Sequence, residues 1–251
     1  MRRFLAALAA VTLLLAGALW ASGHAGQTTS FTPEQRAQIV DIVRAALKSD
    51  PSILRDAIAA LQADDALKQD AAARAAIGKL GPELTKQPGD PVAGNPNGDV
   101  TLVEFYDLRC PYCRRMLPVL AELLKHDPGV RLVYKDIPIL GPGSTIGAKA
   151  VLAARRQGGY LKLHDALMAG SANITEETVH AAATKLGLDW ERLQKDMQDP
   201  AIQGRISANL ALAQTLGIQG TPAYVIGGRL MPGAVSLAQL QEAVSTARTT
   251  Q

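Results

Sequence analysis

The residues best suited to chemistry are Cys110-Pro111-Tyr112-Cys113, which contain the only two cysteines of the chain. An apolar run from Val100 to Tyr106 precedes them and predicts a strand, whereas Arg114 to His126 predicts a helix. The motif therefore lies at a helix N-terminus, whose unpaired N–H groups and partial positive charge stabilise a thiolate. We expect Cys110 to be the nucleophile, and Cys113 to resolve a mixed disulfide.

Two other interpretations of the cysteine pair are weaker. A structural zinc site needs four ligands, and the sequence contains no second Cys pair and no His-x3–5-His pair. A purely structural disulfide that closes so short a loop would constrain the unfolded chain little. The motif therefore predicts redox chemistry carried by the Cys110–Cys113 disulfide itself, with no metal and no organic cofactor.

Two further features could assist the cysteines. Glu104 is a carboxylate on the apolar strand, six residues before Cys110. Buried acids are rare unless they are paired or functional, so Glu104 is either half of an internal ion pair or part of the site. The dipeptide Thr221-Pro222, directly after Gly220, marks either an ordinary turn before a strand or a substrate-binding loop.

The elements that must position these residues follow the order β-α-β, a helical block, then β-β-α. Strands are expected at 101–106, 130–137, 222–226 and 229–231, with helices at 114–126, 144–157, 160–168, 176–186, 190–197, 201–216 and 237–247. The short crossover makes the first two strands parallel, and Gly227-Gly228 predicts a hairpin between the last two. This order predicts an α/β protein with a thioredoxin fold, interrupted by a helical insertion at about 141–217.

The N-terminus has the pattern of a cleaved signal peptide, expected to span residues 1–25. Arg2 and Arg3 precede an apolar stretch from Phe4 to Trp20, and Gly23-His24-Ala25 offers a cleavage site. An uncleaved membrane anchor is the alternative, because the stretch approaches membrane-spanning length. Export would place the cysteines in an oxidising compartment. Removing the two arginines from 26 basic residues leaves 24 against 23 acidic ones, which implies no nucleic-acid partner.

Residues 26–85 predict a helical extension. Thr32, Pro33 and Gln35 form a helix start with a capping box, and apolar stripes follow over 39–47 and 53–61. Such a stripe must be buried, either on the catalytic domain of the same chain or on the equivalent helices of sister chains. We expect the second, an oligomer. The Pro- and Gly-rich residues 86–99 predict a linker or loop at the start of the catalytic domain, 86–251.

From Asp99 onward, the chain resembles the DsbA-like thiol–disulfide oxidoreductases of the thioredoxin superfamily. The resemblance covers about residues 92–247 and is carried, in order, by Val103–Tyr106, Cys110–Cys113, Lys135–Leu140 and Gly220–Ala223. The N-terminal extension, Asp50–Leu54 and residues 226–234 are similar to the suppressor-of-copper-sensitivity protein C branch. Members of that branch include trimeric disulfide isomerases, which implies a trimer here.

The resemblance also implies roles for single residues. Glu104 would lie beneath the cysteines and assist proton transfer, with Lys135 as its basic partner. Pro222 would follow a cis peptide bond and face the cysteines, so that Thr221-Pro222 binds an extended peptide by strand addition.

The residues around the cysteines would set their redox character. Pro111 and Tyr112 would contact substrate and define the environment of the thiols. Tyr112 has no positive charge, unlike the histidine that many strongly oxidising members carry, which implies a milder, more isomerase-like poise. Arg109, Arg114 and Arg115 either add stabilisation to the thiolate or are solvated surface residues.

Together these observations predict an exported, periplasmic thiol–disulfide exchange enzyme that acts on protein disulfides as an isomerase or reductase. Its partners would be cysteine-containing exported clients, a membrane redox protein that resets the dithiol, and sister chains. The alternatives are a DsbA-like oxidase that introduces disulfides, and a Cu(I)-binding copper-tolerance protein, because thiolates suit that soft metal.

Overall fold

The computed structural model describes residues 31–250, so the expected signal peptide lies outside the described residues. The chain divides into two compact units, Met1–Gln62 and Ala63–Gln251. No helix within residues 31–250 combines the length and the apolar character needed to cross a membrane.

The first unit contains α2 (Pro33–Ser49) and the beginning of α3 (Ser52–Lys79). Helix α2 begins as predicted, because Thr32 and Gln35 form a capping box and Pro33 takes the first helical position. No residue of α2 is buried. Ten large apolar side chains of the unit are exposed, among them Phe31 and Val40. The other eight recur at helical spacing along α2 and α3: Ile39, Ile42, Val43, Leu47, Ile53, Leu54, Ile58 and Leu61. We call these eight residues the apolar stripe.

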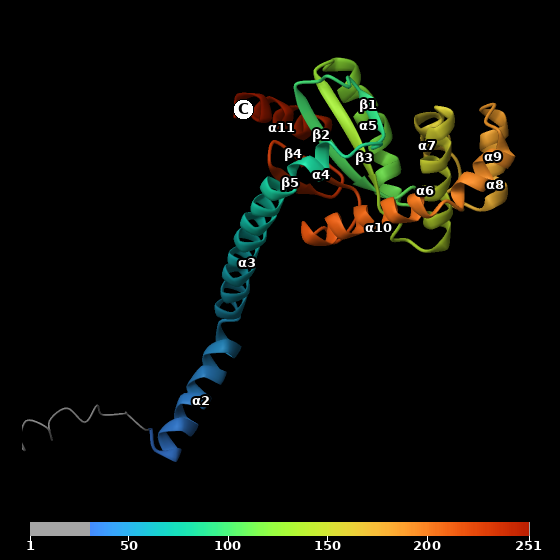
Figure 1. Cartoon of the computed structure of the whole chain (residues 1–251). Helices are drawn as coiled ribbons and strands as arrows, with labels where there is room; N and C mark the ends of the chain where they lie inside the picture. The colour runs from blue at the N-terminus through green and yellow to red at the C-terminus, as the bar shows by residue number, and fades with distance from the viewer. Residues whose placement is uncertain (1–30, 251) are drawn as a thin grey trace, which may run out of the picture. The chain divides into compact units, whose positions relative to one another are not determined.

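The second unit is built on a five-stranded sheet in the order β1-β3-β2-β4-β5 (Figure 1). Its strands are β1 (Val92–Gly94), β2 (Val100–Tyr106), β3 (Val130–Asp136), β4 (Ala223–Ile226) and β5 (Arg229–Pro232). Strands β2 and β3 are parallel, as predicted from the short crossover, and the other pairs are antiparallel. Gly227 and Gly228 have φ of 52° and 74°, which suits the tight β4–β5 hairpin.

The two faces of the sheet are covered by different helices, since successive strand residues point to opposite sides. The α5 face carries Leu102, Leu132 and Tyr224, which pack with residues of α5 (Pro111–His126), α7 (Tyr160–Ala169) and α11 (Leu237–Thr249). The α10 face carries Val103, Phe105 and Val133, which pack with residues of α3, α4 (Gly81–Thr85) and α10 (Pro200–Thr215).

The helical insertion lies between β3 and β4, where the sequence predicts it. It comprises α6 (Pro142–Ala154), the short 3-10 helix η1 (Arg155–Gln157), α7, α8 (Glu176–Lys185), α9 (Trp190–Met197) and α10. Helices α7, α8 and α9 gather to one side of the sheet (Figure 1). Side chains of α6, such as Val151, and of α9, such as Leu193, complete the core of the α5 face.

The expected linker is wrong in part, because residues 86–99 contain the edge strand β1. Ala93 pairs antiparallel with Leu132 of β3, and Pro91 accepts a backbone hydrogen bond of 3.0 Å from Tyr134. Strand β1 has only three residues, and turn-forming residues lie on both sides of it, so the local sequence predicts a loop. The strand conformation comes from the pairing with β3.

The C-terminal part of the expected extension belongs to the second unit, which begins at Ala63. Ile77 of α3 and Leu84 of α4 are buried in the core of the α10 face. The structure therefore shows the first alternative for one part of the extension, while packing on sister chains stays a prediction. The side chains of Ala73, Ile77 and Leu84 pack on the catalytic domain of the same chain, and the apolar stripe stays exposed in the first unit.

Candidate active site

Cys110 and Cys113 lie at the start of α5, directly beyond the end of β2. Cys110 is the N-cap residue in an extended conformation, and its carbonyl accepts a hydrogen bond of 3.1 Å from Arg114. Both cysteines are buried, with 4% of Cys110 and 1% of Cys113 exposed. The sequence predicted that Cys110 would be more exposed than Cys113. The exposed fractions of the two residues differ in that direction, but only slightly.

The two thiols have different surroundings. The Cys110 thiol donates a hydrogen bond of 3.2 Å to the carbonyl oxygen of Thr221. Burial raises the pKa of the Cys113 thiol far above its ordinary value, and the charge of Glu104 raises it further. The Cys113 thiol therefore does not ionise readily, and its reaction needs a proton acceptor.

The Thr221–Pro222 peptide bond is cis, as the resemblance implied, and this loop faces the cysteines. The Pro222 carbonyl accepts a hydrogen bond of 2.8 Å from the backbone N–H of Gly233, beyond the β4–β5 hairpin. The loop is thus held from one side by the hairpin and contacts Cys110 on the other.

Glu104 points to the α5 face, the side from which α5 covers the sheet. It is 1% exposed and accepts a hydrogen bond of 3.2 Å from the hydroxyl of Tyr224, its partner on β4. Burial raises the pKa of Glu104 to about 8, and the neighbouring charge of Asp136 adds to the shift. A carboxyl with this pKa can take up and release a proton near neutral pH.

The expected pairing of Glu104 with Lys135 is wrong, because the two side chains point to opposite faces of the sheet. In the β2–β3 register, Glu104 lies opposite Tyr134, and Lys135 lies opposite Phe105. Side chains alternate along each strand, so Lys135 points to the α10 face.

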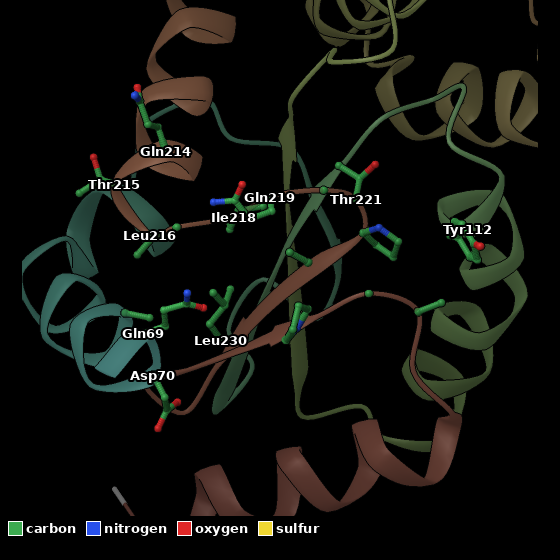
Figure 2. A pocket seen from close by; sticks show the side chains of 18 of the residues that line it. Gln69, Asp70, Tyr112, Gln214, Thr215, Leu216, Ile218, Gln219, Thr221 and Leu230 are labelled. Carbon is green, nitrogen blue, oxygen red and sulfur yellow. The ribbon is translucent and has the colours of Figure 1, made fainter. Parts of the chain in front are cut away.

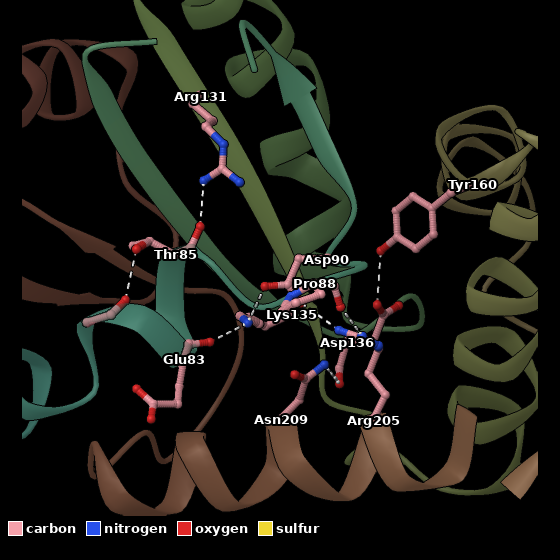
Figure 3. A network of polar contacts seen from close by, with 11 residues as sticks. Glu83, Thr85, Pro88, Asp90, Arg131, Lys135, Asp136, Tyr160, Arg205 and Asn209 are labelled. Atoms are coloured by element: carbon pink, nitrogen blue, oxygen red, sulfur yellow. Dashed lines mark hydrogen bonds and ion pairs between the residues drawn. The ribbon is translucent and has the colours of Figure 1, made fainter. Parts of the chain in front are cut away.

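Lys135 instead belongs to a buried ionic cluster (Figure 3). Its ammonium group contacts Asp90 at 2.6 Å and donates to the Glu83 carbonyl at 2.8 Å. Asp90 also pairs with Arg205 of α10 at 2.8 Å. The cluster ties β3 to α4, to the segment before β1 and to α10. This arrangement gives Lys135 an architectural role.

A second polar cluster, on the α5 face, was not foreseen. The hydroxyls of Tyr106 and Tyr160 both donate to the carboxylate of Asp136, and they lie 2.8 Å from each other. Burial raises the pKa of Asp136 to about 6. Asp136 follows Tyr134 by two residues, so strand alternation places both on one face of the sheet, and the register of β3 with β2 makes this the face of Glu104.

The arginines near the cysteines mainly hold the surrounding backbone. Arg114 donates to the carbonyl of Leu108 and to four carbonyls at the C-terminal end of α7 and just after it, those of Leu167, Met168, Gly170 and Ser171. Arg109 donates to the carbonyls of Leu140 and Ala172. The guanidinium of Arg115 lies 4.5 Å from the ring centroid of Tyr112, a cation–π contact.

Asp107 is a further residue that the sequence did not single out. Its buried carboxylate accepts hydrogen bonds from the backbone of Arg109, Ile139 and Leu140 and from the hydroxyl of Ser144. It thereby joins the turn before Cys110 to the loop that leads into α6. Its position between the end of a predicted strand and the cysteine motif could have marked Asp107 as a residue of the site.

A pocket of about 960 Å³ opens beside the cis-proline loop (Figure 2). Tyr112, 52% exposed, lines it together with Thr221 and Pro222. The sequence-predicted substrate contacts Tyr112, Thr221 and Pro222 thus meet at one surface; Pro111 is the first residue of α5 and does not line the pocket. Across residues 31–250, no group of three or more His, Cys, Asp and Glu side chains is arranged to hold a metal ion.

A thioredoxin fold with Cys-x-x-Cys at the start of the helix after a central strand, and with a cis-proline loop facing it, defines the class of thiol–disulfide oxidoreductases. The chain belongs to the DSBA-like thioredoxin domain family, whose profile matches residues 101–245. A second profile, the copper resistance protein ScsC N-terminal domain, matches residues 35–67. These matches confirm the resemblance seen in the sequence.

Two solved structures are similar over most of their length. A thioredoxin-like oxidoreductase from Silicibacter pomeroyi DSS-3 is 49% identical with a TM-score of 0.66, covering 68% of this chain and 98% of that one. ScsC from Proteus mirabilis, in a transitional conformation, is 30% identical with a TM-score of 0.65, covering 90% of this chain and 100% of that one.

A curated relative is much longer than this chain. The Na(+)/H(+) antiporter NhaA 3 of Salinispora tropica is 32% identical over 160 residues, which cover 63% of this chain and 24% of the antiporter. The chain thus spans about a quarter of the length of this relative.

Proposed function

We propose that this protein is an exported dithiol enzyme that isomerises or reduces disulfides in client proteins. The observation that carries the proposal is the contact between the Cys110 thiol and the Thr221 carbonyl at the edge of the pocket. A client strand that pairs with this loop would bring its own disulfide to Cys110.

The exchange begins when the Cys110 thiolate attacks one sulfur of a client disulfide. A new S–S bond joins Cys110 to the client, and the second client sulfur leaves as a thiolate. In isomerisation, that thiolate attacks another disulfide of the client, and a later attack releases Cys110 with no net change in electrons. In reduction, Cys113 loses its proton and attacks the sulfur of Cys110, so the dithiol gives two electrons to the client.

The environment of Cys113 supports the isomerase direction. Because burial raises the pKa of its thiol, Cys113 resolves the mixed disulfide slowly unless Glu104 accepts the proton. A mixed disulfide that persists leaves the client time to rearrange its other disulfides. Glu104 reaches its carboxylate form in only about a tenth of molecules one pH unit below a pKa of about 8.

The apolar stripe supports an oligomer, with a trimer as the proposed state. The eight exposed side chains of the apolar stripe form a larger apolar surface than a helix exposed to solvent usually carries. The ScsC N-terminal domain profile matches the same region, residues 35–67. Several cysteine pairs around one client can hold it and reshuffle its disulfides. The proposed site of action is the periplasm, where a membrane redox protein would restore the reduced dithiol.

Refolding of scrambled ribonuclease, compared with insulin reduction, tests the proposal. The full chain is expected to restore ribonuclease activity, and Cys110→Ser is expected to abolish it. Thiol trapping in cells provides the second measurement. Cys110 and Cys113 found mostly reduced support isomerase or reductase action, whereas a mostly oxidised pair would indicate the oxidase alternative. Tight Cu(I) binding without any disulfide activity would contradict the proposal as a whole.

A further inference from the structure

The pocket beside the cysteines has a wall that comes from α3, outside the DSBA-like segment. Ala66, Gln69, Asp70 and Ala73 of α3 line the pocket. Their spacing places them on one face of the helix. All of these residues belong to the second unit, together with the rest of the pocket.

The pocket runs from the cysteine motif to this wall. Figure 2 shows Tyr112 at one side, Gln69 and Asp70 at the other, and Ile218, Leu230 and Thr221 between them. Its volume of about 960 Å³ lies near the upper end of the roughly 300–1,000 Å³ that enclose a drug-sized ligand. It is therefore larger than one side chain needs, and a client segment of several residues fits it.

The chemistry of the wall favours an apolar occupant. Ala66 and Ala73 are small and leave room, while Ile218 and Leu230 supply apolar surface on the facing side. The carboxylate of Asp70 already forms an ion pair with Arg74 at 2.8 Å, so it does not require a cationic ligand. Burial of a bulky apolar side chain here would remove apolar surface from water and so favour binding.

The position of the pocket identifies the occupant. Tyr112 follows Cys110 by two residues, and the Thr221 residue whose carbonyl accepts the Cys110 hydrogen bond lines the pocket, so the Cys110 thiol lies next to the pocket. A client joined to Cys110 by a disulfide must place the residues next to its own cysteine in this space.

We propose that the α3 wall selects client segments that carry a bulky apolar or aromatic side chain a few residues from the reacting cysteine. Helix α3 then serves substrate choice, in addition to leading to the apolar stripe. The inference rests on the proposed function, since it concerns the client of the same dithiol.

The test uses the full chain with Cys113→Ser, so that the mixed disulfide accumulates and can be weighed by mass spectrometry. Substrates are cysteine peptides capped with glutathione, with Phe or Ser two, three or four residues from the cysteine, and glutathione disulfide as the small reference. At one spacing or more, the Phe peptide is expected to react about tenfold faster than its Ser counterpart, relative to glutathione disulfide.

Gln69→Trp fills the α3 end of the pocket and is expected to abolish the preference for Phe. Ala66→Trp serves as a second variant on the same face, and both replaced residues are exposed. The matched control is Ala71→Trp, an exposed alanine of the same helix that does not line the pocket. It is expected to keep the preference.

The outcomes separate the inference from the proposed function. If the protein reacts with every peptide at the same rate, the inference is wrong. This outcome is expected if a second copy of the chain fills the pocket. It is equally wrong if both tryptophan variants keep the preference. If Cys110 reacts with none of the disulfides, glutathione disulfide included, the proposed function itself fails.

Discussion

Cys110 and Thr221 are 111 residues apart in the chain, yet the thiol of the first donates a hydrogen bond of 3.2 Å to the carbonyl oxygen of the second. A thiolate cannot donate, so ionisation of Cys110 frees that carbonyl. The same carbonyl can then accept a hydrogen bond from the backbone of a client strand. In the proposed mechanism, the contact thus links ionisation of Cys110 to the binding of its substrate.

Replacing Cys113 by Ser is expected to trap clients on Cys110. Without the second thiol, the mixed disulfide can be released only by an external thiol or by the client itself. Non-reducing electrophoresis of the variant after incubation with scrambled ribonuclease should show covalent adducts. Cys110→Ser, the matched control, should form none, and adducts that depended on Cys113 instead would reverse the assignment of the nucleophile.

Replacing Glu104 by Gln is expected to slow resolution by Cys113 about a hundredfold, the usual contribution of a positioned general base. Because Glu104 must be ionised to accept the proton, the wild-type rate should rise with pH through about 8. Single-turnover release of a trapped peptide across this range measures the profile. The variant should lose that inflection; if it kept the inflection, Glu104 would not be the acceptor.

The same substitution is expected to stabilise the fold at alkaline pH. The folded-state pKa of Glu104 lies above its ordinary value of 4.5, at about 8, so the folded state holds the proton more tightly. The carboxyl therefore lowers stability progressively as the pH rises between these two values. Thermal melts should show a larger gain for Glu104→Gln at about pH 9 than at about pH 5. A gain independent of pH would mean that the carboxyl titrates normally.

Replacing Lys135 by Met is expected to reduce stability by about 3 kcal/mol, because Asp90 then loses one of its two buried cationic partners. Urea unfolding measures the loss. The pH inflection of resolution should stay where it is, since Lys135 points to the α10 face and Glu104 to the α5 face. Lys162→Met, at an exposed position of α7, is the control. A displaced inflection would restore Lys135 as the partner of Glu104.

Charging the apolar stripe is expected to dissociate the proposed oligomer. In the double variant Ile42→Asp, Leu61→Asp, two side chains that are 68% and 61% exposed in the single chain become unable to pack with sister chains. Sedimentation velocity should change from the mass of three chains to one, and ribonuclease isomerisation should fall more than insulin reduction. The control Gln38→Asp, Gln62→Asp adds the same charge at exposed polar positions.

Much of the fold follows from short-range pattern. The run Val100–Tyr106 and the Gly227-Gly228 turn could be predicted from the sequence, because β-branched residues favour the strand conformation and glycines favour a tight turn whatever the rest of the chain does. Strand β1 escaped this reasoning because its three residues owe their conformation to the antiparallel pairing with β3. The assignment of residues 63–85 likewise depended on where Ile77 and Leu84 find an apolar surface.

The sequence by itself determined the class of thiol–disulfide oxidoreductase and the place of its cysteine pair. Cys110 and Cys113 are neighbours at a helix start, so their spacing and capping need no information from the rest of the chain. Only the tertiary structure decided which groups serve them. The register of β2 with β3 places Glu104 on the face that carries the cysteines and Lys135 on the opposite face, where it contacts Asp90. The segment after α10 places Thr221 next to Cys110. Through-space partners depend on the packing of the whole sheet, which no local pattern contains.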